Sequence, residues 1–89
     1  SKDLEIMNRL AWLYAKKNLK LELGIELINK AIQASPNRAD FIDTLSELYY
    51  VKGDMNLAVV NIRKAITLEP KNLYYKQQLV RFENSAYTD

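Results

Sequence analysis

The chain has 89 residues, of which 48% are hydrophobic and 27% are charged, and its formal net charge at pH 7 is +2. This composition is typical of one small globular domain, and differs from that of disordered chains and of strongly basic nucleic-acid-binding domains. The chain has no Cys and no His, so a disulfide framework, thiol catalysis, a structural zinc site and histidine-based proton transfer are excluded. Its two Gly and two Pro residues favour an all-α fold over an all-β fold with many turns.

The sequence also lacks the usual signals for membrane insertion or export. No stretch reaches the roughly 18 consecutive apolar residues of a membrane-spanning helix. The charged residues 1–5 are not followed by the apolar segment of a signal peptide. We therefore expect a soluble protein that does not insert into a membrane, and the compartment is not determined.

Two amphipathic helices are predicted first, over residues 2–17 and 21–34. In the first helix, the inward positions are Leu10, Leu13 and Tyr14. In the second helix, the buried stripe consists of Gly24, Ile28, Ala31 and Ile32. Ser35 and Pro36 then end the second helix, since the residue before a proline disfavours helical geometry.

A second pair of helices follows. The third helix is predicted over residues 37–52, with Asn37 as its N-cap and acidic Asp40 in its first turn. Gly53 is expected to end it in a left-handed conformation, and Asp54 to cap the fourth helix, which stops before Pro70. The expected buried positions of this pair are Phe41, Ile42, Leu45, Leu48 and Tyr49, then Leu57, Ala58, Ile62, Ala65 and Ile66.

A fifth helix is predicted over residues 72–86, with Tyr75, Leu79 and Phe82 on its inward face. It is expected to cover Ile62 and Ile66 of the fourth helix.

An internal repeat relates the two pairs. Pro36 and Pro70 lie 34 positions apart, and residues 29–36 align with residues 63–70 at the same offset. Upstream the offset is 35, as between Leu10 and Leu45. The first unit therefore carries one extra residue, which we place in the turn at residues 18–20.

The repeated pattern resembles the tetratricopeptide repeat family, whose unit is a 34-residue pair of helices. The second unit carries the family's spacing in Ile42, Leu45, Ser46, Tyr49, Gly53, Asp54, Ala58, Ile62, Ala65 and Pro70. The resemblance implies an all-α fold, a right-handed superhelix of five helices. It implies one domain over residues 1–89, with repeats at about 4–36 and 37–70 and a capping helix at about 72–86. Buried small residues such as Ala11, Ser46 and Ala58 would let the helices approach closely.

In this family, the first helix of each pair lines a concave groove, so the resemblance implies a non-catalytic protein-interaction module without a cofactor. The outward positions form the candidate peptide-binding site, namely Asn8, Arg9, Trp12, Asp40, Asp43, Thr44, Glu47, Tyr50, Tyr74, Gln78 and Arg81, with Glu5, Lys16 and Gln77 beside them. Spacing places the carboxylates of Asp40, Asp43 and Glu47 in solvent. A protein partner with Lys or Arg in a peptide or helix would suit them. Reversing the charges of Asp43 and Glu47 is expected to abolish binding and keep helicity.

Other functions have weaker support. Repeats that hold the acidic ends of chaperones use a clamp of Lys, Asn and Arg side chains. The corresponding positions here carry no positive charge, namely Asn8, Trp12, Thr44, Tyr74 and Gln78. A metal site is not expected, because its three carboxylates would come from one helix. The basic turns at residues 16–20 and 71–76 are solubilising rather than nucleic-acid-binding.

The alternative to a peptide-binding module is a structural role in a longer array or a homo-oligomer. It would use an apolar terminal helix face of Leu79, Val80, Phe82, Ala86 and Tyr87.

Overall fold

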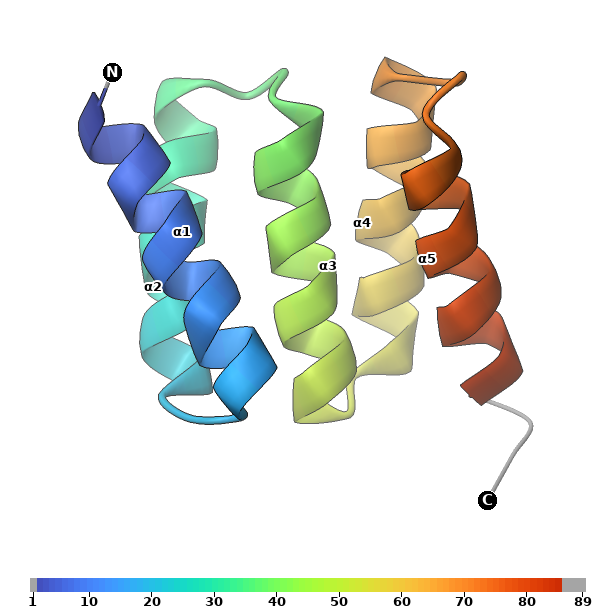
Figure 1. Cartoon of the computed structure of the whole chain (residues 1–89), viewed down its shortest axis with the longest axis horizontal. Coiled ribbons are helices and arrows are strands. Elements are labelled where there is room, and N and C mark those ends of the chain that lie inside the picture. Colours follow the sequence, from blue (N-terminus) through green and yellow to red (C-terminus); the bar gives the residue numbers. More distant parts are fainter. Residues whose placement is uncertain (1, 86–89) are drawn as a thin grey trace.

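The computed structural model describes residues 2–85, which form five α-helices and no strand. The helices are α1 (Lys2–Lys17), α2 (Leu21–Ala34), α3 (Ala39–Lys52), α4 (Met55–Leu68) and α5 (Leu73–Ser85). In Figure 1, α1, α3 and α5 form the nearer layer, and α2 and α4 lie behind them. The predicted all-α helical repeat fold is confirmed. Within residues 2–85, no helix combines the length and the apolar character that crossing a membrane requires.

The turn inside each helix pair forms as its sequence predicts. Gly53 ends α3 with φ at 98°, in the left-handed region that glycine adopts without a steric penalty. The Asp54 carboxylate caps α4 by accepting a hydrogen bond from the Leu57 N–H at 3.1 Å. The corresponding turn of the first pair has three residues, of which Asn18 and Lys20 have positive φ. Because residues 53 and 54 alone make the second turn, the extra residue lies where the offset placed it.

The predicted N-cap of α3 is wrong. The residue before the helix is Arg38 rather than Asn37, and the Arg38 side chain makes no capping hydrogen bond. The cause is a turn in which the Arg38 N–H donates to the Ser35 carbonyl at 3.3 Å, so that Asn37 belongs to the turn. The Asp40 carboxylate, in the first helical turn, accepts a hydrogen bond from the Phe41 N–H at 3.1 Å. Its negative charge is also stabilised by the positive end of the helix dipole.

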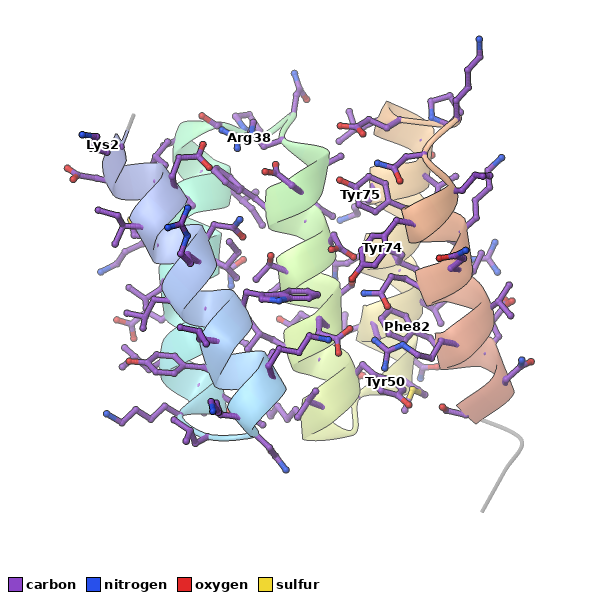
Figure 2. The ribbon with its side chains drawn as sticks, viewed as in Figure 1. Lys2, Arg38, Tyr50, Tyr74, Tyr75 and Phe82 are labelled. Atoms are coloured by element: carbon purple, nitrogen blue, oxygen red, sulfur yellow. The ribbon has the colours of Figure 1, made fainter. Side chains whose placement is uncertain are left out.

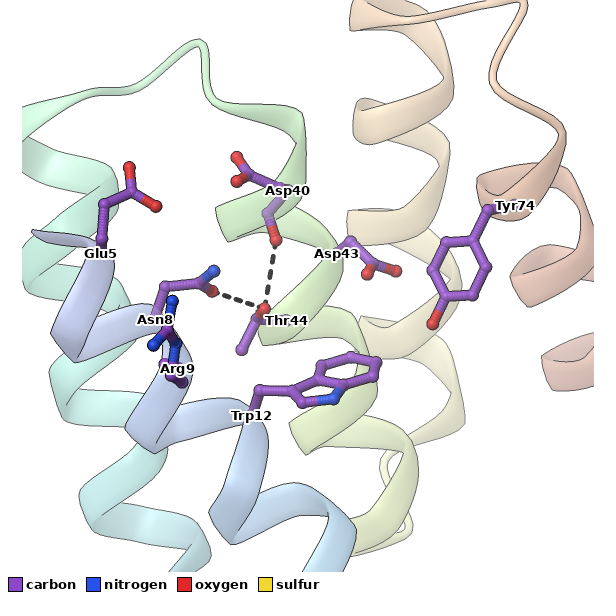
Figure 3. Close-up of a pocket in the computed structure, with 8 residues that line it drawn as sticks. All are labelled: Glu5, Asn8, Arg9, Trp12, Asp40, Asp43, Thr44 and Tyr74. Atoms are coloured by element: carbon purple, nitrogen blue, oxygen red, sulfur yellow. Dashed lines mark hydrogen bonds between the residues drawn. The ribbon is translucent and has the colours of Figure 1, made fainter.

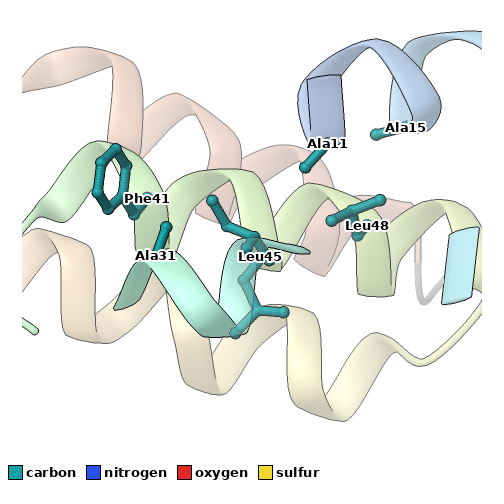
Figure 4. Packing of buried hydrophobic residues seen from close by; sticks show 7 residues of the cluster. Ala11, Ala15, Ala31, Phe41, Leu45 and Leu48 are labelled. Atoms are coloured by element: carbon teal, nitrogen blue, oxygen red, sulfur yellow. The ribbon is translucent and has the colours of Figure 1, made fainter. Parts of the chain in front are cut away.

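Two hydrophobic clusters form the core, and α3 contributes to both. The first joins α1, α2 and α3 through Ala11, Ala15, Ile28, Ala31, Phe41, Leu45 and Leu48 (Figure 4). The second joins α3, α4 and α5 through Ala39, Ile42, Ala58, Ile62, Ala65, Tyr75 and Phe82. Since helices pack on both sides of α3, all residues from 41 to 48 are buried.

Close approach between helices depends on small residues, as predicted. Ala11, Ser46 and Ala58 are fully buried. At Gly24, an added Cβ would lie 2.9 Å from Leu48 Cδ2, so α2 packs against α3 at a distance that suits glycine. This contact explains a helical glycine despite its low helix propensity.

Three leucines predicted to be inward are exposed instead. Leu13 is 46% exposed, and Leu10 and Leu57 are similarly accessible. The helix α1 packs on α2 and α3 through Ala11 and Ala15, so no helix of residues 2–85 covers the side that carries Leu10 and Leu13. The spacing of apolar residues identified an amphipathic helix, but it did not identify which of two adjacent apolar stripes is covered.

Candidate functional site

An open pocket of about 380 Å³ lies on the face formed by α1, α3 and α5 (Figure 3). Its lining residues are Glu5, Asn8, Arg9 and Trp12 of α1, Asp40, Asp43 and Thr44 of α3, and Tyr74 of α5. Seven of the eight belong to the predicted groove site and Glu5 was predicted beside it, and residues of three helices far apart in sequence meet here. Four further predicted positions, Glu47, Tyr50, Gln78 and Arg81, lie outside this lining.

Hydrogen bonds hold α1 and α3 together beside the pocket. The buried Thr44 hydroxyl donates to Asn8 Oδ1 at 2.6 Å and lies 3.1 Å from the backbone carbonyl oxygen of Asp40. Figure 3 shows both contacts. These polar side chains therefore position the α1 wall of the pocket relative to α3.

Arg38 binds two carboxylates at the edge of the pocket, and the sequence pattern did not single it out. Its guanidinium donates to Asp40 through Nε at 2.9 Å and through Nη2 at 2.8 Å. Nη2 also lies 2.7 Å from Glu5 Oε2 on α1. The hydrogen bonds to Asp40 and Glu5 raise the pKa of Arg38. One of the two negative charges of Glu5 and Asp40 is thus balanced by Arg38.

The central carboxylates do not face solvent as spacing predicted. Asp43 is 6% exposed and Glu47 is 2% exposed, and Gln78 of α5 is buried with them. The Gln78 amide donates to Asp43 Oδ1 at 3.1 Å and to Glu47 Oε1 at 2.9 Å. The reason is that α5, which packs mainly on α4, sends the side chains of Gln78 and Arg81 to this part of α3, so the carboxylates form a contact between the two helices.

Cations surround one of the two buried carboxylates. Arg81 of α5 binds Glu47 Oε1, and Lys16 Nζ of α1 lies 3.5 Å from Glu47 Oε2. Arg81 Nη2 also donates to the Gln78 side-chain oxygen at 2.8 Å. Within residues 2–85, no cation lies at ion-pair distance from Asp43. Glu47 is therefore the centre of an ion-pair network, and Asp43 is bonded to a neutral amide.

Tyr50, predicted to face the groove, instead belongs to the α3–α5 contact. Its ring stacks on Phe82 with the ring centres 4.8 Å apart. Figure 2 labels both side chains, on α3 and α5. Its hydroxyl lies 2.7 Å from Ser85 Oγ, and the Arg81 guanidinium lies 4.5 Å from its ring centre. The sequence carried a signal for the contact of α5 with α3. Gln78 and Arg81 are three residues apart on α5, so their side chains lie on one face of that helix.

The aromatic residues of the pocket remain accessible to different degrees. Trp12 is half-buried, and Lys16 Nζ lies 4.3 Å from the centre of its ring. Tyr74 is 44% exposed, so it is only partly buried. This partial burial raises the pKa of its hydroxyl to about 12, and the negative charges of Asp43 and Glu47 add to the rise. The pocket therefore has two aromatic walls near buried carboxylates.

Burial raises the pKa of Asp43 to about 6. The charge of Glu47 raises it further, whereas the hydrogen bond from Gln78 and the charges of Lys16 and Arg81 lower it. Desolvation disfavours the ionised form most, since no ion pair compensates it. Asp43 is thus a carboxyl group whose protonation changes close to physiological pH.

Asp43 should make the stability of the domain fall as pH rises. Between pH 4 and pH 6, the unfolded chain is ionised at Asp43 while the folded chain keeps the proton, so the folded state binds more protons and loses stability with rising pH. The loss is complete above the folded pKa and amounts to about 3 kcal/mol. Asp43→Asn keeps the size and an acceptor for Gln78 without the charge. The variant should therefore become more stable relative to the wild type as pH rises. The difference between their free energies of unfolding should grow by about 2–3 kcal/mol from pH 4 to pH 7.

Urea titrations at pH 4, 5, 6 and 7 measure this difference. The contributions of the other ionisable groups largely cancel, because the wild type and the variant share them. Asp3→Asn, at an exposed acid of α1, is the matched control. A difference that is constant with pH for Asp43→Asn would contradict the assignment.

Acidic residues in the described part of the chain do not come together as a cation site. No group of three His, Cys, Asp or Glu residues within residues 2–85 has the arrangement of a metal site. Asp40 turns toward Arg38, and Gln78 bridges Asp43 and Glu47. The three carboxylates of α3 are therefore bound by side chains of the chain itself, Asp40 by Arg38 and both Asp43 and Glu47 by Gln78.

The outer face of α5 differs from the predicted apolar end. Phe82 is completely buried and Leu79 is half-buried, whereas Leu73 is 68% exposed and Val80 is also exposed. A second open hollow of about 310 Å³ is lined by Leu73, Lys76, Gln77 and Val80. Residues 86 and 87, also predicted to belong to this face, lie outside the described residues.

Comparison with protein-family models gives one match, to the tetratricopeptide repeat over residues 39–72. This match covers α3, α4 and the turn to α5. No curated protein sequence matches the chain. The matched repeat is of a type that serves generally in protein–protein interaction. Further helices, α1 and α2 before the matched segment and α5 after it, flank it in the structure. Residues 39–72 therefore match the tetratricopeptide repeat, and the five helices of residues 2–85 have the paired arrangement of an all-α helical repeat fold.

Proposed function

We propose that the chain is a non-catalytic protein-interaction module that binds a peptide or helix of a basic partner on the face formed by α1, α3 and α5. The observation that carries the proposal is the pocket of about 380 Å³, which predicted groove residues from all three helices line. A surface that several helices build together presents separate side chains at fixed spacing, which suits an extended or helical segment.

The chemistry of the lining supports a peptide that carries positive charge. Three lining residues are acidic and one, Arg9, is basic. Asn8 and Thr44 add polar atoms, and Trp12 and Tyr74 add aromatic surface of the kind that dominates binding energies at protein interfaces. An acidic surface with aromatic walls favours Lys- or Arg-bearing segments and repels acidic ones.

Selection from a library of random twelve-residue peptides, followed by titration of the selected peptides, tests this function. Tyr74→Ala combined with Trp12→Ala should weaken binding at least tenfold, because it removes both aromatic walls. The matched control is Leu57→Ala with Leu68→Ala, two exposed apolar residues of α4, and it should leave the affinity unchanged. Circular dichroism checks that each variant is folded.

Selected peptides that bind the groove variant as tightly as the wild type would contradict the proposed surface. So would a set of selected peptides without enrichment in Lys or Arg.

Self-association through α5 is the second candidate function. The observation that favours it is the apolar hollow at Leu73 and Val80, both exposed. Sedimentation velocity separates the two candidates. Self-association makes the sedimentation coefficient rise with protein concentration, and a peptide-binding monomer shows no such rise.

A further inference from the structure

We propose that the pocket between α1, α3 and α5 takes a single cationic side chain, Lys or Arg, from the partner, with its charge against Asp43 and its apolar stem between Trp12 and Tyr74. This inference rests on the proposed function and deepens it, because it names the residue type that the pocket selects and the carboxylate that binds it.

The first argument is the environment of Asp43. Its side chain lines the pocket although 94% of the residue surface is buried, and one of its oxygens accepts a hydrogen bond from the neutral Gln78 amide. The nearby cations Arg81 and Lys16 both bind Glu47 instead. A buried carboxylate without a counter-charge is unfavourable, so a cation delivered by a partner is stabilised at this position.

The second argument is that the other pocket carboxylates have partners. Glu5 and Asp40 share the guanidinium of Arg38 at the edge of the pocket. They add to the negative potential, but Asp43 is the lining carboxylate that no cation of residues 2–85 neutralises. The incoming charge therefore has one best position.

The third argument is the aromatic pair. Figure 3 shows the Trp12 indole and the Tyr74 ring extending into the same space as the Asp43 carboxylate, from α1 and α5 respectively. Cations bind favourably over aromatic faces, and long aliphatic stems pack against them. This arrangement fits the side chain of Lys or Arg better than it fits a small inorganic cation.

Arg9 provides the strongest objection, because it is the one basic residue among the eight that line the pocket. If the ligand were an anion, Arg9 would be its binding residue. With Arg38 included, three carboxylates stand against two guanidinium groups. The remaining negative charge favours a cation, and Arg9 then weakens the binding by repulsion. The two readings make opposite predictions for Arg9→Ala.

The binding should also depend on pH. Asp43 is faced by Glu47 on its own helix, by Lys16 and Arg9 of α1, and by Gln78, Arg81 and Tyr74 of α5. With its pKa raised to about 6 by burial, Asp43 is ionised at pH 7.5 and largely protonated at pH 5. A cationic ligand that binds the ionised form should lose affinity over this range.

Trp12 is the single tryptophan of the chain, so its indole N–H reports on the pocket in a ¹H–¹⁵N spectrum. The probes are acetylated and amidated Gly-Ser-Lys-Ser-Gly and its analogues with Arg, norleucine or Glu at the centre. At pH 7.5, the Lys and Arg peptides should shift the indole signal in a saturable manner at millimolar concentration. The norleucine and Glu peptides should not.

Asp43→Asn should weaken binding of the Lys and Arg peptides about tenfold and remove its pH dependence, because a charge-assisted contact is lost. Tyr74→Ala should weaken it about threefold, and Arg9→Ala should leave it unchanged or strengthen it. Asp3→Asn is the matched control with unchanged affinity.

Three results would overturn the inference: no saturable shift with the Lys or Arg peptide, an equal shift with norleucine, or loss of binding in Arg9→Ala. If these occur while twelve-residue peptides still lose affinity on removal of Trp12 and Tyr74, the proposed groove stands without the cation pocket. If both sets fail, the proposed function fails with it.

Discussion

Replacing Glu47 with Lys is expected to destabilise the domain by about 3–5 kcal/mol, which approaches the whole stability of a chain of this size. Glu47 is 2% exposed and holds Arg81, Lys16 and Gln78 together. The variant removes their common acceptor and buries a third positive charge between two cations. Urea unfolding followed by circular dichroism at pH 7 measures the loss.

Two further variants show whether the cause is the buried charge. Glu47→Gln keeps the shape and an acceptor oxygen, and should lose about 1–3 kcal/mol. Glu26→Lys makes the same charge reversal on α2, where the Glu26 side chain is 65% exposed and pairs only with Lys30 in the ion pairs of residues 2–85. It should change stability by no more than about 0.5 kcal/mol. Equal effects of the reversals at Glu47 and Glu26 would show that the network does not stabilise the fold.

This expectation replaces the one drawn from spacing alone. If Asp43 and Glu47 faced solvent, reversing both charges would abolish binding and preserve helicity. Because both are buried against α5, the double reversal would unfold the site together with its scaffold. Tests of binding therefore need the accessible residues Trp12 and Tyr74 and the isosteric change at Asp43.

Truncating Phe82 to Ala is expected to cost about 3–5 kcal/mol and to loosen α5 first. Phe82 is completely buried, belongs to the cluster that covers Ile62, and stacks on Tyr50. Since α5 packs on the rest of the fold along one side, loss of this anchor should release it before α1–α3 unfold. Hydrogen exchange of residues 73–85 should accelerate more than that of residues 39–52.

Phe82→Leu and Leu73→Ala provide the comparison. Leu refills most of the volume and should cost about 1–2 kcal/mol. Leu73 is 68% exposed on the same helix, so its truncation should have almost no effect. Uniform acceleration of exchange across all five helices in Phe82→Ala would contradict the idea that α5 is the first element to separate.

Local chemistry explains what could be predicted well. Helix ends depend on a few residues with special backbone or hydrogen-bonding properties, such as Gly53 and Asp54, and these are visible in a sequence. The 34-residue offset predicted two successive pairs of helices. Small residues indicated where these helices approach each other closely. Asn37 was wrongly predicted as a helix cap because it belongs to a turn, in which the Arg38 N–H donates to the Ser35 carbonyl. Such a turn has no distinctive sequence pattern.

The candidate site divides in the same way. Helical spacing identified the lining residues of the pocket, because the first helices of the pairs turn one face in a common direction. Spacing could not show that Gln78 and Arg81 would reach Glu47, or that Arg38 would reach Glu5, since these contacts join positions 31 to 34 residues apart. Helical spacing also predicted that Leu13 is buried, but no helix of residues 2–85 covers that side of α1.

The sequence by itself determined the five helices, their turns and the repeated pairing, because periodicity and capping act within a few residues. The tertiary structure alone decided which polar residues of α3 are buried, because burial depends on the helices packed on both sides of it. Asp43 shows the difference most clearly. Its position on the groove face follows from spacing, whereas its missing counter-charge and raised pKa follow from where α5 places Gln78 and Arg81.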